Sequence, residues 1–211
     1  MIPDDASDRL LESAHKIGKL CEKLGVQQWE VFGTQGYGHS LDIEADKITM
    51  ASGGGDGGFG IRLVNDGKYG FAHVVDSDAA EVSVIEAIKI AEKSPSIEGF
   101  ELPGNHSSKD VGGMKDTKIL NMSPEDLLEQ GDQVLTRVKE LDSRASAVGG
   151  GIGIGAGATA IVTSSGIESH GIHTQHGIGV HISIDADNHL TSAYEGEYSR
   201  TSIADICSSV D

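Results

Sequence analysis

Glycine is the residue that most limits how this chain can fold. The 211 residues include 29 glycines but only 4 prolines. Glycine permits tight turns and a close approach of one backbone to another, whereas proline-rich linkers and collagen need many prolines. The composition therefore predicts tight turns and close-packed strands. Because aromatic residues make up only 4% of the chain, the core must be built mainly from Ile, Val, Leu and Ala.

Three segments show the apolar period of an amphipathic helix. The first ends before Gly25, which suits the left-handed position after a helix. The second runs from about Ser77 to Lys93. The third begins at the N-cap Ser123, with Pro124 in the first helical position. The predicted buried stripes are Leu10, Ala14, Ile17, Cys21 and Leu24; Ala80, Val84, Ile88 and Ala91; and Leu127, Val134, Val138 and Leu141.

Short runs of alternating apolar and polar residues predict strands between and after these helices. Asn65-Asp66-Gly67 is a strong hairpin signal, and Ser165-Gly166 indicates a second turn. The sequence thus predicts an α+β fold, in which antiparallel sheets carry amphipathic helices packed on one side. The predicted strands are 27–34, 40–46, 48–52, 59–64, 69–75, 145–157, 159–164, 167–174, 176–187 and 191–198.

Prolines and glycines between residues 95 and 116 predict a loop and the best internal boundary. We expect one unit at 1–95, a helix, an antiparallel meander and a helix. A second unit, a helix with antiparallel strands, is expected at 115–200. A last helix is expected to open near Ser202, and Asp211 follows before it completes three turns. We therefore expect 201–211 to lead into a missing C-terminal domain.

The formal net charge is −17, which repels phosphate backbones, so we expect no nucleic-acid partner. The acidity indicates either a solvated surface or an acidic groove for basic peptides. Cys21 falls on an apolar helical face and predicts a small buried side chain. Because the N-terminus is acidic and no apolar run reaches about 18 residues, we expect a cytoplasmic protein without a membrane partner.

The histidines at 170, 173, 176 and 181 form the most prominent chemical cluster. Metal sites use imidazoles in such numbers. The surrounding pattern predicts strands, however, on which His170 and His173 point to opposite faces. This favours a solvated or hydrogen-bonded set of histidines over a metal site.

Two glycine-rich runs raise a second possibility. Gly53, Gly55 and Gly58 match G-x-G-x-x-G, but a dinucleotide site needs a following helix, and a strand follows here. We therefore expect a flexible hairpin loop. The glycines of 149–157 indicate a strand closely approached by another backbone. That backbone is either a packed neighbour or a peptide added by β-augmentation.

The charged residues of the predicted strands offer weaker candidates. Asp42 with Glu44, and Asp185 with Asp187, each share one strand face, which favours a solvated face over acid–base catalysis. Arg62 lies among apolar neighbours and predicts a buried or half-buried ion pair. The sequence assigns no catalytic, cofactor-binding or metal-binding residue.

Two segments nevertheless carry a family signal. The first is Gly58-Phe59-Gly60-Ile61-Arg62-Leu63 followed by Asp66-Gly67-Lys68-Tyr69-Gly70-Phe71-Ala72. The second is Thr163-Ser164-Ser165-Gly166-Ile167, followed by His181-Ile182-Ser183-Ile184 and Ala193-Tyr194-Glu195. In order and spacing these segments resemble the N-terminal portion of the TldD/PmbA (TldD/TldE) peptidase family, slightly closer to the PmbA/TldE type of subunit.

The resemblance implies longer proteins in which two related subunits pair, as hetero- or homodimers, into a metallopeptidase. It implies proteolysis of unfolded or leader peptides, and an extended peptide as substrate. In the family, a His-Glu-x-x-x-His motif of the C-terminal half carries the metal; this sequence lacks that motif. Zinc or another divalent metal is expected in the missing domain or the partner subunit. The alternatives are a non-catalytic peptide- or protein-binding module and, less favoured, a small-molecule or metal binder at the histidine-rich hairpin.

Overall fold

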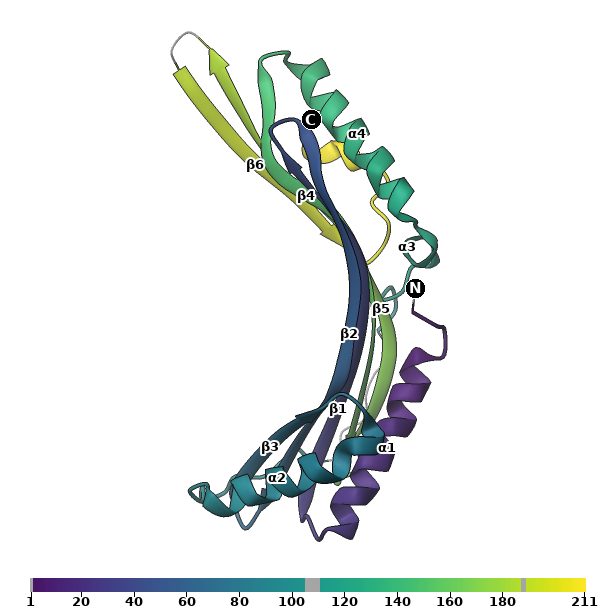
Figure 1. The fold of residues 1–211 in the computed structure, drawn as a ribbon, viewed down its shortest axis with the longest axis vertical. Helices are drawn as coiled ribbons and strands as arrows, with labels where there is room; N and C mark the ends of the chain where they lie inside the picture. Colours follow the sequence, from purple (N-terminus) through teal and green to yellow (C-terminus); the bar gives the residue numbers. More distant parts are fainter. Residues whose placement is uncertain (1, 105–110, 187–188) are drawn as a thin grey trace.

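A computed structural model describes residues 2–104, 111–186 and 189–211. Its centre is one antiparallel sheet in the order β3-β2-β1-β4-β5-β6 (Figure 1). The predicted α+β class, with antiparallel strands and helices on one side, is confirmed. The strands are β1 (Gln28–Glu44), β2 (Lys47–Asn65), β3 (Lys68–Val74), β4 (Ala145–Thr163), β5 (Glu168–Ala186) and β6 (His189–Ser199).

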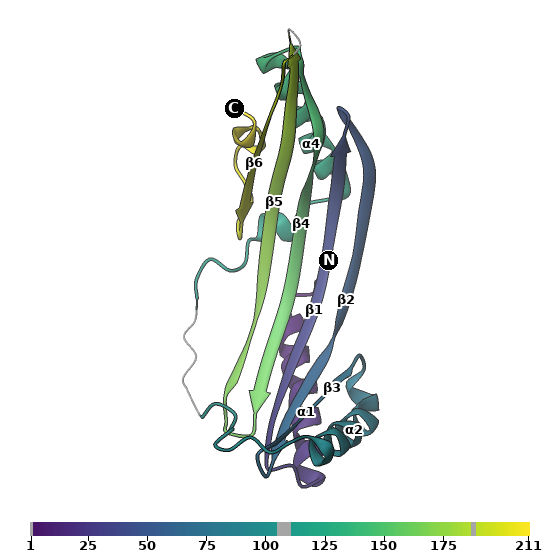
Figure 2. The same ribbon diagram turned by 90° about the vertical axis from the view of Figure 1, so that its left-hand side faces the viewer.

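The sheet is long and bent, and its helices lie on the convex face (Figures 1 and 2). At one end α1 (Ala6–Lys23) and α2 (Ala80–Lys93), the latter preceded by the 3-10 turn η1 (Ser77–Ala79), cover the sheet. At the other end α3 (Thr117–Asn121), α4 (Pro124–Leu141) and the 3-10 turn η2 (Ile206–Ser209) cover it. A separate hydrophobic core lies between each group of helices and the sheet.

The first helix forms as its apolar stripe predicts. Leu10, Ala14, Ile17 and Cys21 are buried against the sheet, and Gly25 follows with a φ of 78°. The prediction of five short strands after this helix was wrong, because residues 28–74 form only β1, β2 and β3. The predicted hairpin turn at Asn65-Asp66-Gly67 holds and joins β2 to β3.

The glycine-rich run 53–58 is the main cause of that error. It was predicted to be a hairpin loop, but it lies inside β2, paired in register with residues 34–39 of β1. A continuous partner strand supplies hydrogen bonds to these glycines, and this outweighs their low intrinsic strand propensity. Tertiary pairing, which no local pattern reveals, therefore decides the structure of this run.

In the second half, α4 begins with a capping box in which Ser123 and Asp126 bond each other's backbone N–H groups. The short α3 was not predicted. The four strands predicted between 145 and 187 are instead two, β4 and β5. Residue 187, the end of the last of these predicted strands, lies outside the described residues. The expected helix from Ser202 was also wrong, since only η2 forms, four residues later.

The predicted units at 1–95 and 115–200 contribute to the same sheet. β1 pairs with β4 from Glu30 opposite Thr163 to Ile43 opposite Gly150. The β1–β4 ladder therefore runs through both cores. The connection between the units has no helix or strand in residues 95–104 and 111–116, apart from an isolated bridge between Lys68 and Ser96.

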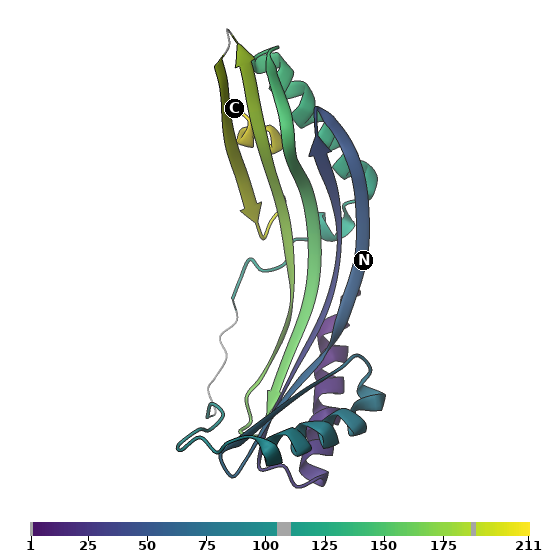
Figure 3. The ribbon, with the colours of Figure 1, turned by 60° about the vertical axis from the view of Figure 1, so that its left-hand side comes forward.

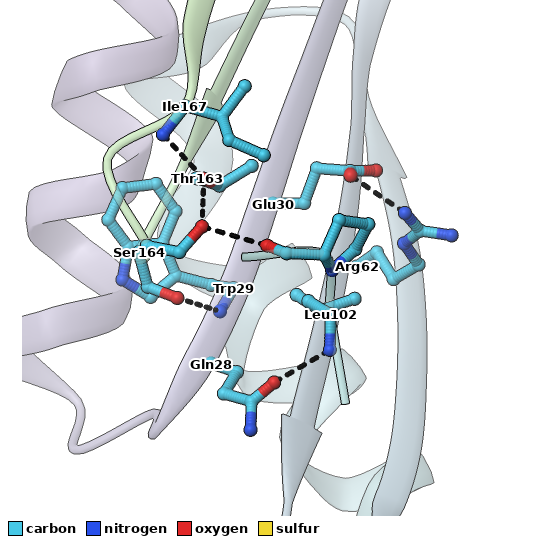
Figure 4. A network of polar contacts seen from close by, with 10 residues as sticks. Gln28, Trp29, Glu30, Arg62, Leu102, Thr163, Ser164 and Ile167 are labelled. Atoms are coloured by element: carbon cyan, nitrogen blue, oxygen red, sulfur yellow. Dashed lines mark hydrogen bonds and ion pairs between the residues drawn. The ribbon is translucent and has the colours of Figure 1, made fainter. Parts of the chain in front are cut away.

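Parts of the two segments that carried the family signal lie at the same end of the sheet, on either side of β1 (Figure 4). Glu30 of β1 is paired with Arg62 of the first segment and with Thr163 of the second. The Ser164 side chain accepts a hydrogen bond from the Trp29 N–H at 3.1 Å. The Thr163 hydroxyl accepts one from the Ile167 N–H at 3.0 Å and bonds Ser165 at 2.9 Å. These hydroxyls therefore fix the β4–β5 turn to the start of β1, which gives the Thr-Ser-Ser-Gly run a structural role.

Candidate functional site

The concave face of the sheet carries the candidate site. Among the described residues no helix covers this face, which Figure 3 shows turned toward the viewer. Two adjoining depressions lie along its middle, of about 490 Å³ and 660 Å³. They share Gly38, Gly54, Ile154 and Gln175 as lining residues. We call the two together the trough.

Glycines form the floor of the trough. In β1 and β4, Gly36 lies opposite Gly157 and Gly38 lies opposite Gly155. These four residues, which we call the glycine square, have no side chains to fill the space above the sheet. A Cβ at Gly38 would lie 2.8 Å from the backbone oxygen of Ile154. The bend of the sheet thus leaves no room for a side chain there, so glycine is required by the backbone itself.

Polar side chains from the neighbouring strands lean over this floor. A Cβ at Gly36 would lie 3.1 Å from Oδ1 of Asp56, which comes from β2. On the opposite side, β5 contributes two groups. The ring of His173 lies over Gly157, with Cε1 2.5 Å from the Cβ position, and the Gln175 side chain lies over Gly155, with Nε2 at 3.2 Å. A carboxylate, an imidazole and an amide thus surround the glycine square.

The larger depression has an aromatic wall on β6. Tyr198 lies across Gly177, and Tyr194 lies across Gly179. Both tyrosines remain exposed, at 81% and 62%. Across the trough Ser40 and Ser52 bond each other at 2.8 Å. This half of the trough therefore offers flat apolar surfaces beside hydroxyl groups.

The electrostatic character of the trough is acidic to neutral. Asp42 and Asp56 line it, and neither depression is lined by a Lys or Arg among the described residues. Burial lowers the pKa of His173, and the positive charge of Arg200 lowers it further. His173 is therefore neutral at pH 7. The trough disfavours anions and accommodates neutral or cationic groups.

One edge of the sheet beside the trough is open. β3 pairs only with residues 59–65 of β2. In the described part of the chain no strand pairs with the outer side of β2 from Lys47 to Gly58. Such an edge presents unpaired N–H and C=O groups, to which an extended chain can add as a further strand.

The structure separates the histidines of the predicted cluster. His170 pairs with Asp8 at 3.0 Å on the convex face, whereas His173 faces the trough. His176 is fully buried, with Nε2 3.1 Å from Gln130 Oε1 and Nδ1 accepting from the Ile203 N–H at 3.1 Å. Within residues 2–104, 111–186 and 189–211, no three His, Cys, Asp or Glu side chains lie close enough to hold a metal ion.

Other sequence-based predictions have clear outcomes. Arg62 forms the predicted half-buried ion pair, with Glu30 at 2.7 Å (Figure 4). Cys21 is fully buried, and this burial raises the pKa of its thiol to about 12. Asp42 lines the trough while Glu44 is exposed at the strand end. Asp187 lies outside the described residues.

Sequence reasoning singled out none of the trough residues Asp56, Gln175 and Tyr198. They converge only because β2, β5 and β6 flank the glycine strands in one sheet. One signal existed: the glycines of 149–157 predicted close approach by another backbone, and β1 and β5 are the neighbours that provide it.

None of the described helices is long and apolar enough to cross a membrane.

Comparison with known proteins identifies relatives. The sequence profile of PmbA/TldA metallopeptidase domain 1 matches residues 29–94. An uncharacterised protein of Methanocaldococcus jannaschii, MJ0231, is 29% identical over 172 residues, which are 82% of this chain and 39% of that protein. The chain thus spans about two fifths of the length of this relative.

Solved structures share the fold. TldE from Thermococcus kodakarensis superposes with a TM-score of 0.79 at 18% identity, covering 88% of this chain and 42% of that one. A putative modulator of DNA gyrase from Thermotoga maritima gives 0.78 at 14% identity, covering 90% and 43%. A similarly described protein from Bacteroides thetaiotaomicron gives 0.77 at 20% identity, covering 95% and 46%. Residues 29–94 thus resemble the first domain of PmbA/TldA metallopeptidases, and the chain as a whole shares the fold of these three structures, of which it spans less than half the length.

Proposed function

We propose that this chain is the peptide-holding part of a TldD/PmbA-type metallopeptidase or of its non-metal partner subunit. It acts in the proteolysis of unfolded or leader peptides in the cytoplasm, and hydrolysis takes place outside these residues. The resemblance noted in the sequence favours the TldE type of partner. The observation that carries the proposal is the trough, an open concave surface floored by backbone instead of side chains.

A glycine floor suits an extended peptide for a physical reason. Without Cβ atoms at the glycine square, the side chains of Asp56, His173 and Gln175 lie close against the sheet. A guest backbone can therefore approach the sheet more closely than it could over side chains that stand upright. Because the floor of the trough has few side chains of its own, few of its contacts depend on the amino-acid sequence of the bound peptide. A surface that accepts many unfolded peptides needs this combination.

Catalysis would come from a metal held in the C-terminal half of a longer chain or in a homologous partner subunit, with which this chain forms a hetero- or homodimer. There the metal would activate water for attack on the peptide carbonyl. The residues of this chain would position the peptide for that step.

The test of peptide holding uses two strand glycines. Gly54 borders the trough, and Gly171 of β5 lines neither depression. A Cβ at either position would meet no atom within 4 Å, so both positions accept a side chain without strain. We expect Gly54→Leu to weaken binding of a fluorescent unstructured peptide, measured by anisotropy, and Gly171→Leu to leave it unchanged. Equal binding by both variants would place the peptide elsewhere.

The role in proteolysis needs a second experiment. The chain is mixed with a full-length, metal-bearing relative and zinc, and cleavage of an unstructured peptide is followed by mass spectrometry. We expect the chain alone to be inert and the mixture to cleave faster than the relative alone. Peptide binding without any gain in the mixture would favour the alternative, a non-catalytic peptide- or protein-binding module.

A further inference from the structure

We propose that the glycine square and its three polar neighbours form a recognition site for a primary ammonium group, supplied by a lysine side chain or a free N-terminus of the bound peptide. This inference rests on the proposed function and adds the chemical class that the trough selects. The site consists of Asp56, His173 and Gln175 above the glycine square.

Geometry brings the three side chains together. Gly36 and Gly157 are directly opposite one another, and opposite Cα atoms in antiparallel strands are roughly 5 Å apart. The Asp56 carboxylate lies over one glycine and the His173 ring over the other. Gln175 lies over Gly155, two residues along β4. A guest atom above the square can therefore approach all three groups from the open side of the trough.

The polar groups match an ammonium ion. An ammonium carries three N–H donors and no acceptor. The site offers a carboxylate oxygen of Asp56 and, in the Nδ1-protonated tautomer, Nε2 of His173. Gln175 presents its amide nitrogen to Gly155, so its amide group must turn over to bring the oxygen to the guest. Burial lowers the pKa of His173, so its ring is neutral and Nε2 can accept. A phosphate or carboxylate guest would instead face Asp56 with no lysine or arginine lining the described trough.

No hydrogen bond or ion pair within the described residues engages Asp56 or His173 side chains. The conformation that places both side chains over the glycines therefore does not arise from pairing between Asp56 and His173.

The whole chain also carries a net charge of −17, which attracts any cation. The experiment must therefore separate a shaped site from general attraction.

The first experiment titrates the isolated chain with butylammonium at low ionic strength and follows the His173 and Gln175 side chains by NMR. Butylguanidinium, which has the same charge but a planar head, is the matched ligand. Asp185→Asn is the matched variant, because Asp185 is an exposed carboxylate of β5 that lines neither depression. We expect Asp56→Asn to weaken butylammonium binding about tenfold, as for a lost charge-assisted hydrogen bond, and Asp185→Asn to leave it unchanged.

Two results would overturn the site: equal weakening by the two variants, or equal binding of butylammonium and butylguanidinium to the wild type. Either would mean that net charge alone attracts the cation. A denaturation midpoint measured for each variant confirms that the fold is intact. If Asp56→Asn lowers that midpoint, Gln175→Leu provides the second variant, with weakened butylammonium binding as the expected result.

The second experiment identifies the source of the ammonium. Three unstructured peptides are compared: one with a free N-terminus and no lysine, one acetylated with a single lysine, and one acetylated with norleucine in place of lysine. We expect one of the first two to bind about tenfold more tightly than the third. Equal binding of all three, lost in Gly54→Leu, would keep the peptide-holding function and reject the ammonium site. Asp56-dependent butylammonium binding without any peptide binding would keep the ammonium site and reject the peptide-holding function.

Discussion

Gly18 of α1 lies against the indole ring of Trp29, so that a Cβ atom added at position 18 would lie 2.6 Å from Cζ3 of that ring. The indole is 96% buried, since its residue is only 4% exposed, and cannot move aside. Glycine is ordinarily unfavourable inside a helix by about 0.8–1 kcal/mol relative to alanine. At this position the contact with Trp29 decides the residue instead.

We therefore expect Gly18→Ala to lower the free energy of unfolding by about 1–3 kcal/mol, the usual cost of overpacking. Gly131→Ala in α4 is the control. Its Cβ would lie 2.8 Å from Cδ1 of Ile48, the free end of a half-buried side chain that can rotate. We expect that variant to be neutral or more stable by up to about 0.8 kcal/mol. Urea denaturation compares them, and the reverse order would refute the packing argument.

The glycine floor makes a second stability prediction. Gly38 and Gly54 lie opposite one another in β1 and β2, but only Gly38 has a backbone oxygen within 2.8 Å of its Cβ position. We expect Gly38→Ala to lower the unfolding free energy by about 1–3 kcal/mol. Gly54→Ala should be neutral or slightly stabilising, because it lowers the entropy of the unfolded chain. Similar losses in both variants would mean that the floor excludes side chains for another reason.

Asp46 ties the β1–β2 turn to β4 and α4. Its carboxylate accepts from the Ala147 N–H at 2.7 Å and pairs with Lys139 at 2.9 Å. Its φ is 61°, so Asp46→Gly keeps the turn and removes only the side chain. We expect this change to lower the unfolding free energy by about 1 kcal/mol. Ala45→Gly, at the neighbouring φ of 49°, should cause no loss.

This contribution should depend on pH. Burial opposes ionisation of Asp46, but the hydrogen bonds from Lys139 and Ala147 outweigh it and lower the pKa of the carboxyl. The stabilisation is therefore present above the unfolded value of 3.8 and is lost as the pH falls through the lower folded value. The difference between wild type and Asp46→Gly should shrink over that acidic range, and a constant difference would contradict the assignment.

His176 predicts a separate loss of stability in acid. Its Nδ1 accepts from the Ile203 N–H, so Nε2 carries the proton and donates to Gln130. Burial lowers the pKa of His176, although Glu197 partly opposes this. Because the folded pKa lies below the unfolded 6.5, stability is complete above pH 6.5 and falls as the pH decreases toward the folded pKa.

Gln130→Glu tests this directly. A carboxylate beside Nε2 stabilises the charged imidazole and should raise the pKa of His176. The loss of stability between pH 7 and pH 5 should then become smaller than in the wild type. NMR of the ring nitrogens gives the tautomer and the pKa. An unchanged pKa in the variant would show that Gln130 does not control the ring.

The three long helices α1, α2 and α4 were predictable because each is encoded locally. The stripe through Ile17, the N-cap at Ser123 and the glycine at 25 act within one or two turns of their own helix. The hairpin at Asp66-Gly67 is equally local. The core composition follows from the same patterns, since most stripe positions are buried.

The long strands and the trough were not predictable in this way. Gly53 to Gly58 would be a loop in isolation, and becomes a strand because β1 supplies a matching ladder. Asp56 and His173 are brought to the same glycine square by the pairing of β2, β1, β4 and β5. A local reading of 165–176 could place His170 and His173 on opposite faces, but it could not show which face was open.

The passage of β1 and β4 through both cores has a consequence for how the chain melts. If one core unfolded alone, the β1–β4 ladder would break, although the same ladder also supports the other core. β1 and β4 would then lose each other as pairing partners. Two helical clusters that look separate in Figure 1 should therefore respond to heat as one cooperative body. A calorimetric enthalpy of unfolding equal to the van't Hoff enthalpy would show that both cores unfold in a single two-state transition.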